Sequence, residues 1–275
     1  MNNIQRLESL ADEAYQGMFG VTKVTFDKML STLKDAYEQQ HTKGGRPNSR
    51  LSILDKLIIM LGYYREYRTM RHIAFDYGVS KSMIHKSIEW VENVLVKSGE
   101  FALPSKKKLT ETQDEQVVLL DATECEIERP KKKQKNYYSG KKKKHTLKVQ
   151  IVVDASTRDV ICFFVAEGKR HDFNIFQESN VHFTTETQVI ADKGYQGIQK
   201  LHANSVIPVK ATKKHPLTPL EKLYNKLISK CRIYIEHINR YIKRFRIFSS
   251  RYRNRRKRFG LRFSLICGIY NFQHS

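Results

Sequence analysis

The hydrophobic pattern of this 275-residue chain changes type once, at a polar segment between Phe101 and Asp114. Before this segment, apolar residues recur at helical spacing, as they do from Phe26 to Leu33. After it, short apolar runs predict strands, and one long amphipathic helix is expected from about Pro219 to Phe248. The chain is therefore expected to fold as an all-helical region followed by an α/β domain, a mixed sheet flanked by helices.

The helical region divides into residues 1–45, which end at the break Lys43–Pro47, and residues 46–104. In the second part, Ala74, Gly78 and Ser80 have the spacing of a helix-turn-helix: a small residue between helices, a tight turn and a helix cap. The exposed start of the second helix would then meet the base edges of DNA. Its candidate DNA-binding residues are Ser80, Lys81, Ser82, His85 and Lys86. An ordinary helical hairpin is the alternative.

Positive charge gathers in two segments of the second half. The chain has 50 Lys and Arg against 28 Asp and Glu, a formal net charge of +22. Residues 129–145 hold nine Lys or Arg and no carboxylate, and residues 222–275 hold fifteen with one carboxylate. Such clustering indicates binding to phosphate backbones at two places, and solubility tails are the alternative.

Residues 105–275 are expected to form the α/β domain, with a basic insertion over 124–145. The expected strands are Val117–Asp121, Leu147–Asp154, Asp159–Glu167, Gln188–Asp192 and Ser205–Lys210, and a short helix is expected over Asp172–Glu178. Two of these strands end in a carboxylate, Asp121 and Asp192, and strand ends are where ligands collect in mixed sheets.

A third carboxylate, Glu236, is the only acidic residue among the last 54 and lies on the long helix near Arg232, Arg240 and Lys243. One interpretation is a helical ion pair between Arg232 and Glu236. The other is a metal site: three converging carboxylates could hold two Mg²⁺ ions, one for an attacking and one for a leaving oxygen. The three basic side chains would then bind the DNA phosphates.

These residues resemble the signature of DDE transposases. Asp121 lies in LLDATE, Asp192 in ADKGYQG, and Arg232, Glu236 and Lys243 in CRIYIEHINRYIKRFRIF. The closest group is the bacterial insertion-sequence transposases of the IS-five-like family, which is related to the eukaryotic Harbinger transposases. The segment YYSGKKKKH and the pair His171-Asp172 are similar to spacer segments of that family. The resemblance extends from about Ser49 to the C-terminus.

The resemblance implies a ribonuclease H-like catalytic domain in which Asp121, Asp192 and Glu236 are catalytic and bind Mg²⁺, with Mn²⁺ as a substitute. It also implies cleavage at the terminal inverted repeats of a mobile element and transfer of the freed 3′-hydroxyl to target DNA. His171 and Asp172 could orient the metal ligands, or could simply begin a helix. The lysines of the insertion are expected to clamp DNA, or else to form a charged hairpin. The candidate DNA-binding lysines of the insertion are the four nearest the following strand, Lys141, Lys142, Lys143 and Lys144.

Two other functions remain open at this stage: a transposase-derived DNA-binding protein without catalysis, and a ribonuclease H-type endonuclease without strand transfer. Double-stranded DNA is the expected partner, and synapsis of two ends would need a homodimer or larger. No apolar run approaches the ~20 residues of a spanning helix, and no signal peptide is visible, so a membrane is not an expected partner. The four scattered cysteines indicate reduced thiols in a cytoplasmic protein. The resemblance implies that this protein is associated with the nucleoid of a prokaryote.

Overall fold

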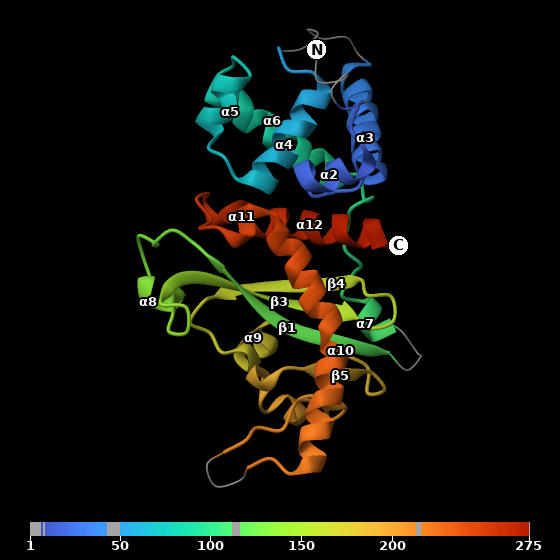
Figure 1. Cartoon of the computed structure of the whole chain (residues 1–275), viewed down its shortest axis with the longest axis vertical. Coiled ribbons are helices and arrows are strands. Elements are labelled where there is room, and N and C mark those ends of the chain that lie inside the picture. The colour runs from blue at the N-terminus through green and yellow to red at the C-terminus, as the bar shows by residue number, and fades with distance from the viewer. Residues whose placement is uncertain (1–6, 8, 43–49, 112–115, 213–215, 275) are drawn as a thin grey trace.

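The structure is a computed structural model that describes residues 7, 9–42, 50–111, 116–212 and 216–274. The helices described before residue 100 form one end of an elongated molecule and a sheet lies in the other half (Figure 1). The C-terminal helices α11 (Arg246–Ser249) and α12 (Phe259–His274) lie between the two parts. The predicted break Lys43–Pro47 is outside the described residues.

The N-terminal helices begin where side-chain oxygens can accept a backbone N–H. They are α2 (Asp12–Phe19), α3 (Lys23–His41), α4 (Ile53–Glu66), α5 (Met70–Asp76) and α6 (Lys81–Lys97). Thr22, Ser52, Thr69 and Ser80 cap the last four of these, and Asp55 completes a capping box with Ser52. Apolar faces of α3, α4 and α6 meet in one core.

The predicted helix-turn-helix geometry is present in α5 and α6. The Ser80 hydroxyl accepts a hydrogen bond from the Met83 N–H at 3.2 Å, as a helix cap should. Gly78 has a φ of +59°, which a residue without a Cβ adopts readily. Ala74 is buried, and its carbonyl accepts the Val79 N–H across the turn.

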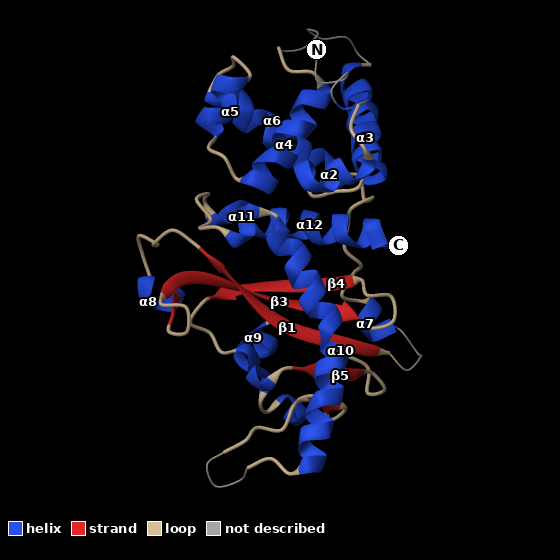
Figure 2. Ribbon diagram, in the orientation of Figure 1, coloured by secondary structure: helices blue, strands red, loops and turns tan. Residues whose placement is uncertain are grey.

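The sheet has the order β4-β3-β1-β5-β6 (Figure 2). The short β2 pairs with the first two residues of β3, before the stretch of β3 that pairs with β4. Strand β1 is antiparallel to β3, which is antiparallel to β4, whereas β1, β5 and β6 are parallel. The strands are β1 (Val117–Glu126), β2 (Tyr138–Ser139), β3 (Lys144–Asp154), β4 (Val160–Glu167), β5 (Gln188–Ala191) and β6 (Ser205–Val206). The strand order along the chain is as predicted, and β1 extends five residues beyond Asp121.

Helices cover both faces of the sheet. Strand residues facing α10 (Pro219–Arg244) and α12 join a core that continues into the N-terminal helices. On the other face, α9 (Asp172–Glu178) and the turns η1 (Lys193–Tyr195) and η2 (Ile198–Lys200) close a smaller core. Two further short helices, α7 (Lys108–Glu111) and α8 (Gln134–Tyr137), lie beside the strands, and η3 (Arg256–Arg258) precedes α12. None of the described helices is long and apolar enough to cross a membrane.

Two predicted elements are shorter than expected. The strand predicted over Ser205–Lys210 ends at Val206, because Pro208 cannot donate to a ladder and Val209 instead pairs with the Asn225 amide of α10. The long helix ends at Arg244 rather than near Phe248. Phe245 is extended, and its fully buried ring packs against Gly20 of the N-terminal part.

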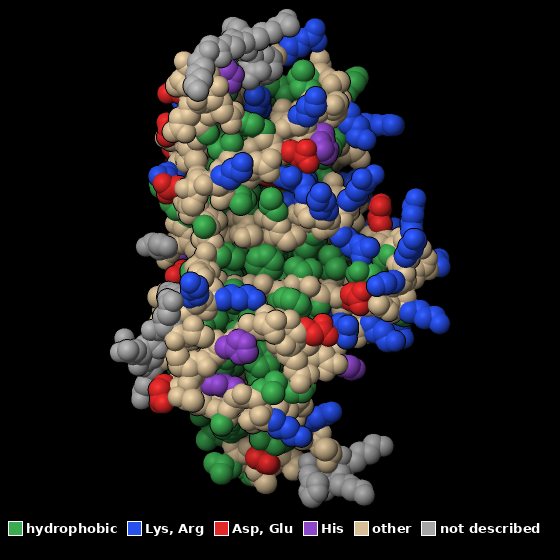
Figure 3. Space-filling view, turned by 180° about the vertical axis from the view of Figure 1, so that it is seen from behind, with side chains coloured by type: hydrophobic (Ala, Val, Ile, Leu, Met, Phe, Trp, Pro, Cys, Tyr) green, Lys and Arg blue, Asp and Glu red, His purple; other side chains and the backbone are tan. Residues whose placement is uncertain are grey.

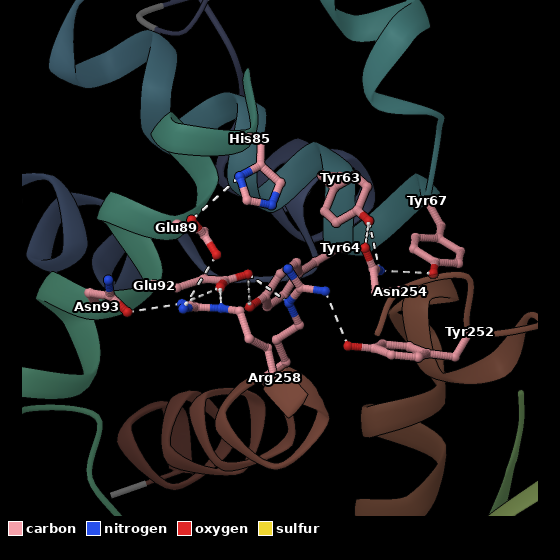
Figure 4. Close-up of polar contacts among 11 residues, drawn as sticks. Tyr63, Tyr64, Tyr67, His85, Glu89, Glu92, Asn93, Tyr252, Asn254 and Arg258 are labelled. Carbon is pink, nitrogen blue, oxygen red and sulfur yellow. Dashed lines mark hydrogen bonds and ion pairs between the residues drawn. The ribbon is translucent and has the colours of Figure 1, made fainter. Parts of the chain in front are cut away.

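The two halves are joined through the carboxylate of Glu92 on α6, which is fully buried. It accepts hydrogen bonds from Arg258 Nε at 2.8 Å, Arg262 Nε at 2.7 Å and the Tyr64 hydroxyl at 2.9 Å. Arg262 also donates to the Tyr252 hydroxyl. Figure 4 shows these contacts between α4, α6 and the segment that leads into α12. Paired in this way, the buried charges hold α6 against the C-terminal helices.

Candidate active site and DNA-binding surfaces

Asp121 and Asp192 lie side by side because β1 and β5 are parallel neighbours in register. Leu120 pairs with Ala191, and each aspartate is the next residue along its strand direction. Adjacent strands are about 4.8 Å apart, so the two carboxylates start from neighbouring backbone positions. The pair predicted from strand ends is therefore brought together by the fold.

Helix α10 places two side chains on the Asp121 carboxylate. Arg232 Nη2 lies 3.3 Å from Oδ1, and the Asn239 amide donates to Oδ2 at 2.9 Å. Arg232 and Asn239 are seven residues apart, two helical turns, and so share one face of α10. The ion pair of Arg232 is thus with Asp121, rather than the helical pair with Glu236 considered as an alternative.

A third aspartate, Asp172 at the start of α9, joins this pair. A Cβ added to Gly194 would lie 2.2 Å from Asp172 Oδ2 and 2.9 Å from Asp192 Oδ1, so only glycine fits between these carboxylates. Lys148 Nζ donates to Asp172 Oδ1 at 2.8 Å. His171 is the residue before α9, and its side chain does not cap the helix.

Burial and like charge make the ionised form of Asp121 unfavourable. Burial raises the pKa of its carboxyl to about 6; the Arg232 guanidinium opposes this shift, and the charges of Asp192 and Asp172 add to it. The phenol of Tyr195, fully buried next to this site, has its pKa raised well above the usual value by burial and by the same three aspartates. The site therefore carries more negative charge than its own cations neutralise.

Glu236 lies on α10 between Arg232 and Asn239, and it is exposed. Residues at its two sides on the helix contact Asp121, so Glu236 borders the same site. Among the described residues, no group of three or more His, Cys, Asp or Glu side chains is arranged to hold a metal ion. Its place as a third ligand remains a prediction.

The donor set suits a hard divalent cation. Asp121 and Asp192 present carboxylate oxygens, the ligand type that Mg²⁺ prefers. The raised pKa of Asp121 indicates that the ionised carboxylate lacks a sufficient countercharge, which a cation would supply. The buried Asn239 Oδ1 makes no hydrogen bond within the described structure, so this amide oxygen is an unused hydrogen-bond acceptor beside Asp121.

Comparison with known families identifies the class to which this arrangement belongs. Residues 120–271 match the family model described as "DDE superfamily endonuclease", which is more than half of the chain. The chain belongs to the DDE superfamily of endonucleases. Residues 49–101 match the model described as "Helix-turn-helix of DDE superfamily endonuclease", which covers α4 to α6.

Two relatives resemble this endonuclease over most of their length. One, from Microchaete diplosiphon, is 42% identical over 98% of both chains and is named "Probable transposase for insertion sequence element IS702". Another, from Streptomyces albus G, is 27% identical over 83% of this chain and 82% of its own, and is named "Putative transposase for insertion sequence element IS112". No solved structure gives a significant match.

The predicted recognition residues of the endonuclease are accessible. Ser80, Lys81, Ser82, His85 and Lys86 are all exposed along the first turns of α6, and His85 Nδ1 lies 3.3 Å from Glu89. The neighbouring Phe75 on α5 is 87% exposed, which is unusual for an aromatic side chain. These residues form one open surface that could meet DNA.

The predicted basic insertion includes a hairpin of β2 and β3, in which Tyr138 pairs with His145 and Ser139 with Lys144. Lys141, Lys142 and Lys143 lie in its exposed turn, and Lys144 pairs with Glu126 at 2.6 Å. We call residues 138–145 the lysine hairpin. Figure 3 shows Lys and Arg side chains gathered along the edge that carries α5 and α8 in Figure 1. Of the other predicted DNA contacts on α10, Arg240 and Lys243 are exposed.

Sequence patterns missed three members of the site. Asn239 is uncharged, so the pattern of charged residues on α10 did not identify it as a site residue. Lys148 follows an apolar residue within a strand and was not distinguished from solvent-facing lysines. Tyr195 lies in the loop after Asp192, where an aromatic residue among Lys, Gly and Gln could have suggested a buried anchor.

Proposed function

We propose that this chain is the transposase of an insertion sequence, which cleaves the terminal inverted repeats of its element and joins the 3′-hydroxyl ends to target DNA. The observation that carries the proposal is the adjacent pair Asp121 and Asp192, each of which directly follows the paired stretch of the parallel strands β1 and β5, beside a strongly basic helix. The names of both relatives and the family of endonucleases support it. Membership of the IS-five-like group is part of the proposal.

The catalytic domain is proposed to be ribonuclease H-like. Three antiparallel strands followed by two parallel ones, in the order β4-β3-β1-β5-β6, support this assignment. The helix that carries Glu236 covers one face of this sheet, and α9 covers the other. In this arrangement, residues 1–45, 46–104 and 105–275 are the proposed helical, helix-turn-helix and catalytic parts.

Asp121, Asp192 and Glu236 are proposed to hold two Mg²⁺ ions, with Mn²⁺ as a substitute. When bound, such ions activate an attacking oxygen and stabilise a leaving oxygen. The Asn239 amide donates to Oδ2 of Asp121 and Arg232 donates to Oδ1, so these two side chains would orient the carboxylate toward the ions. Lys148 fixes Asp172, which in turn borders Asp192. His171 and Asp172 are thereby proposed as orienting residues.

DNA is proposed to lie along the basic edge of the molecule. The first turns of α6 would read the inverted repeat, while the lysine hairpin and the exposed Arg240 and Lys243 would bind phosphates near the cut. Two element ends must be held together for strand transfer, so at least two copies are expected to act on them. The proposed location is the bacterial cytoplasm, on the chromosome.

The test is cleavage of a duplex that ends in the inverted repeat flanking the gene, with Mg²⁺ or with a chelator. Glu236→Gln and Asp192→Asn should each abolish nicking and leave DNA affinity within about twofold, because metal ligands act on the reaction rather than on phosphate binding. Glu13→Gln, a carboxylate exposed on α2, is the matched control and should cut like the wild type.

Three results would contradict the proposal in different ways. Binding without any nicking by the wild type would favour a DNA-binding protein. Cut ends that are never joined to an added target duplex would favour a simple endonuclease. Full activity of Glu236→Gln would remove that residue from the site.

A further inference from the structure

The segment between α11 and α12 carries six cationic residues and no carboxylate from Arg251 to Arg258. We call residues 251–257 the arginine strap. Its side chains alternate: Tyr252 is 1% exposed and Asn254 is half-buried, whereas Arg251, Arg253 and Arg255 are exposed. The alternation places Arg251, Arg253 and Arg255 on the outer side of the strap, and Arg256 and Lys257 follow at the start of η3.

The strap is fixed to the catalytic half through Tyr252. The Tyr252 N–H donates to the Glu126 carbonyl at 2.8 Å, and its own carbonyl accepts the Glu128 N–H at 3.3 Å. Glu126 ends β1, the strand that carries Asp121. Arg262 Nη1 donates to the buried Tyr252 hydroxyl at 3.1 Å. These bonds tie the strap to the end of the catalytic strand.

The strap is also fixed to the helix-turn-helix half, through the end of α4. The Arg253 N–H donates to the Tyr67 hydroxyl at 2.6 Å. The Asn254 amide donates to the hydroxyls of Tyr63 at 2.8 Å and Tyr67 at 3.0 Å. Because Tyr252, Arg253 and Asn254 are bonded to both halves of the molecule, this part of the strap is ordered before any ligand arrives, which lowers the entropic cost of binding.

Apart from Arg251, the basic side chains of the strap have no acidic partners among the described residues. Arg253 and Arg256 lie over the rings of Tyr67 and Tyr137, with Cζ to centroid distances of 4.2 and 4.3 Å. A stacked guanidinium keeps N–H groups at its rim for an anion. Arg255 and Lys257 are exposed. None of these four residues takes part in an ion pair within the described structure, whereas Arg251 pairs with Glu126 at 2.8 Å.

The strap lies between the two proposed DNA-binding surfaces. Arg253 stacks on a residue at the end of α4, and Arg256 stacks on Tyr137 of α8, next to the lysine hairpin. It follows the same edge of the molecule on which basic side chains gather (Figures 1 and 3). We propose that the arginine strap binds backbone phosphates of double-stranded DNA, on the stretch between the site read by α6 and the carboxylates. This rests on the proposed function.

The test is the salt dependence of binding to a duplex of arbitrary sequence, about 40 base pairs long, since phosphate contacts do not require a specific sequence. The variant Arg255→Gln/Lys257→Gln removes two cations that have no partner in the described structure. Each lost phosphate contact makes the slope of log affinity against log salt less steep by about 0.9. A fourfold rise in salt should therefore weaken the wild type about tenfold more than the variant.

The matched control is Lys34→Gln/Lys97→Gln, which removes the same charge from two exposed positions on α3 and at the end of α6, outside both basic segments. Its slope should equal that of the wild type, and both variants should unfold at the wild-type temperature. An unchanged slope for the strap variant, or an equal change for the control, overturns the role of the strap. If the wild type then still binds and nicks DNA, the proposed function stands. A wild type that binds no DNA overturns both.

Discussion

Replacing Glu92 by Gln tests whether one buried carboxylate holds the two halves of the molecule together. The change keeps the shape of the side chain but removes its charge and turns an amide donor toward guanidinium donors. Arg262, whose side chain is only 3% exposed, is left buried without its countercharge. Breaking a buried ion pair by removing one partner costs about 3–5 kcal/mol. That is a large part of the stability of an ordinary domain, about 5–15 kcal/mol.

The assay is urea unfolding, followed by tryptophan fluorescence and by far-ultraviolet circular dichroism. With a denaturant slope of about 3 kcal/mol per molar, the midpoint should fall by about 1–2 M. Glu89→Gln is the matched control: Glu89 also faces Arg258, at 3.6 Å, but its side chain is 33% exposed. An exposed pair contributes about 0–1 kcal/mol, so the control should unfold close to the wild type.

A second comparison separates the buried charge from the buried volume. The variant Glu92→Leu/Arg262→Met removes the carboxylate together with the buried guanidinium of Arg262 and should be less destabilised than the sum of the two single changes. Only Arg258 then lacks Glu92, and its side chain is 25% exposed and also faces Glu89. The reasoning would be refuted if the free energy of unfolding of Glu92→Gln were within about 1 kcal/mol of that of the wild type. The hydrogen bonds of Arg258 and Tyr64 to residue 92 would then be sufficient to join the two halves without the carboxylate charge.

Three further outcomes are expected. Because the pKa of Asp121 rises from 3.8 to about 6 on folding, the native state binds the extra proton, so in chelator the free energy of unfolding should fall by about 2 kcal/mol from pH 4 to pH 7. Unfolding free energies across this range should show the fall, and Asp121→Asn should flatten it; an equally steep fall in the variant would contradict the assignment. Asp172→Asn should lower the nicking rate and leave DNA affinity unchanged, because Lys148 loses the carboxylate that it fixes beside Asp192. Single-turnover nicking at saturating DNA measures this rate. A wild-type rate would show that Asp172 only begins helix α9. Neutralising Lys141–Lys143 should make the salt slope less steep by up to about 2.7, and an unchanged slope would show that the lysine hairpin faces bulk solvent.

Local signals in the sequence were sufficient where a feature depends on residues close together in the chain. The turn at Gly78 and the cap at Ser80 follow from conformational preference and hydrogen bonding within a few residues. Asp121 and Asp192 were selected because each follows an apolar run, and the parallel pairing of β1 with β5 places them next to each other. For Asp121 the run is not the end of the strand, because β1 continues to Glu126. The helix Asp172–Glu178 was predicted with its observed bounds.

Features that depend on distant residues were not predicted. Helix α12 was missed because it is apolar on every side, so it shows little of the periodicity that marks a half-exposed helix. No local pattern marks Glu92 as buried, since its partners Arg258 and Arg262 are more than 160 residues away. The contact of Asn239 with Asp121 spans 118 residues and leaves no local trace.

The position of α12 has a consequence for how the protein matures. Its residues are synthesised after every other described element, yet they fill the layer between the helical end and the sheet. During translation, the apolar surfaces of the helix-turn-helix and of the strands that α12 covers must therefore stay exposed to solvent until α12 has been synthesised. Nascent chains stalled before Phe259 should be sensitive to protease throughout, and protection should arrive in both halves together.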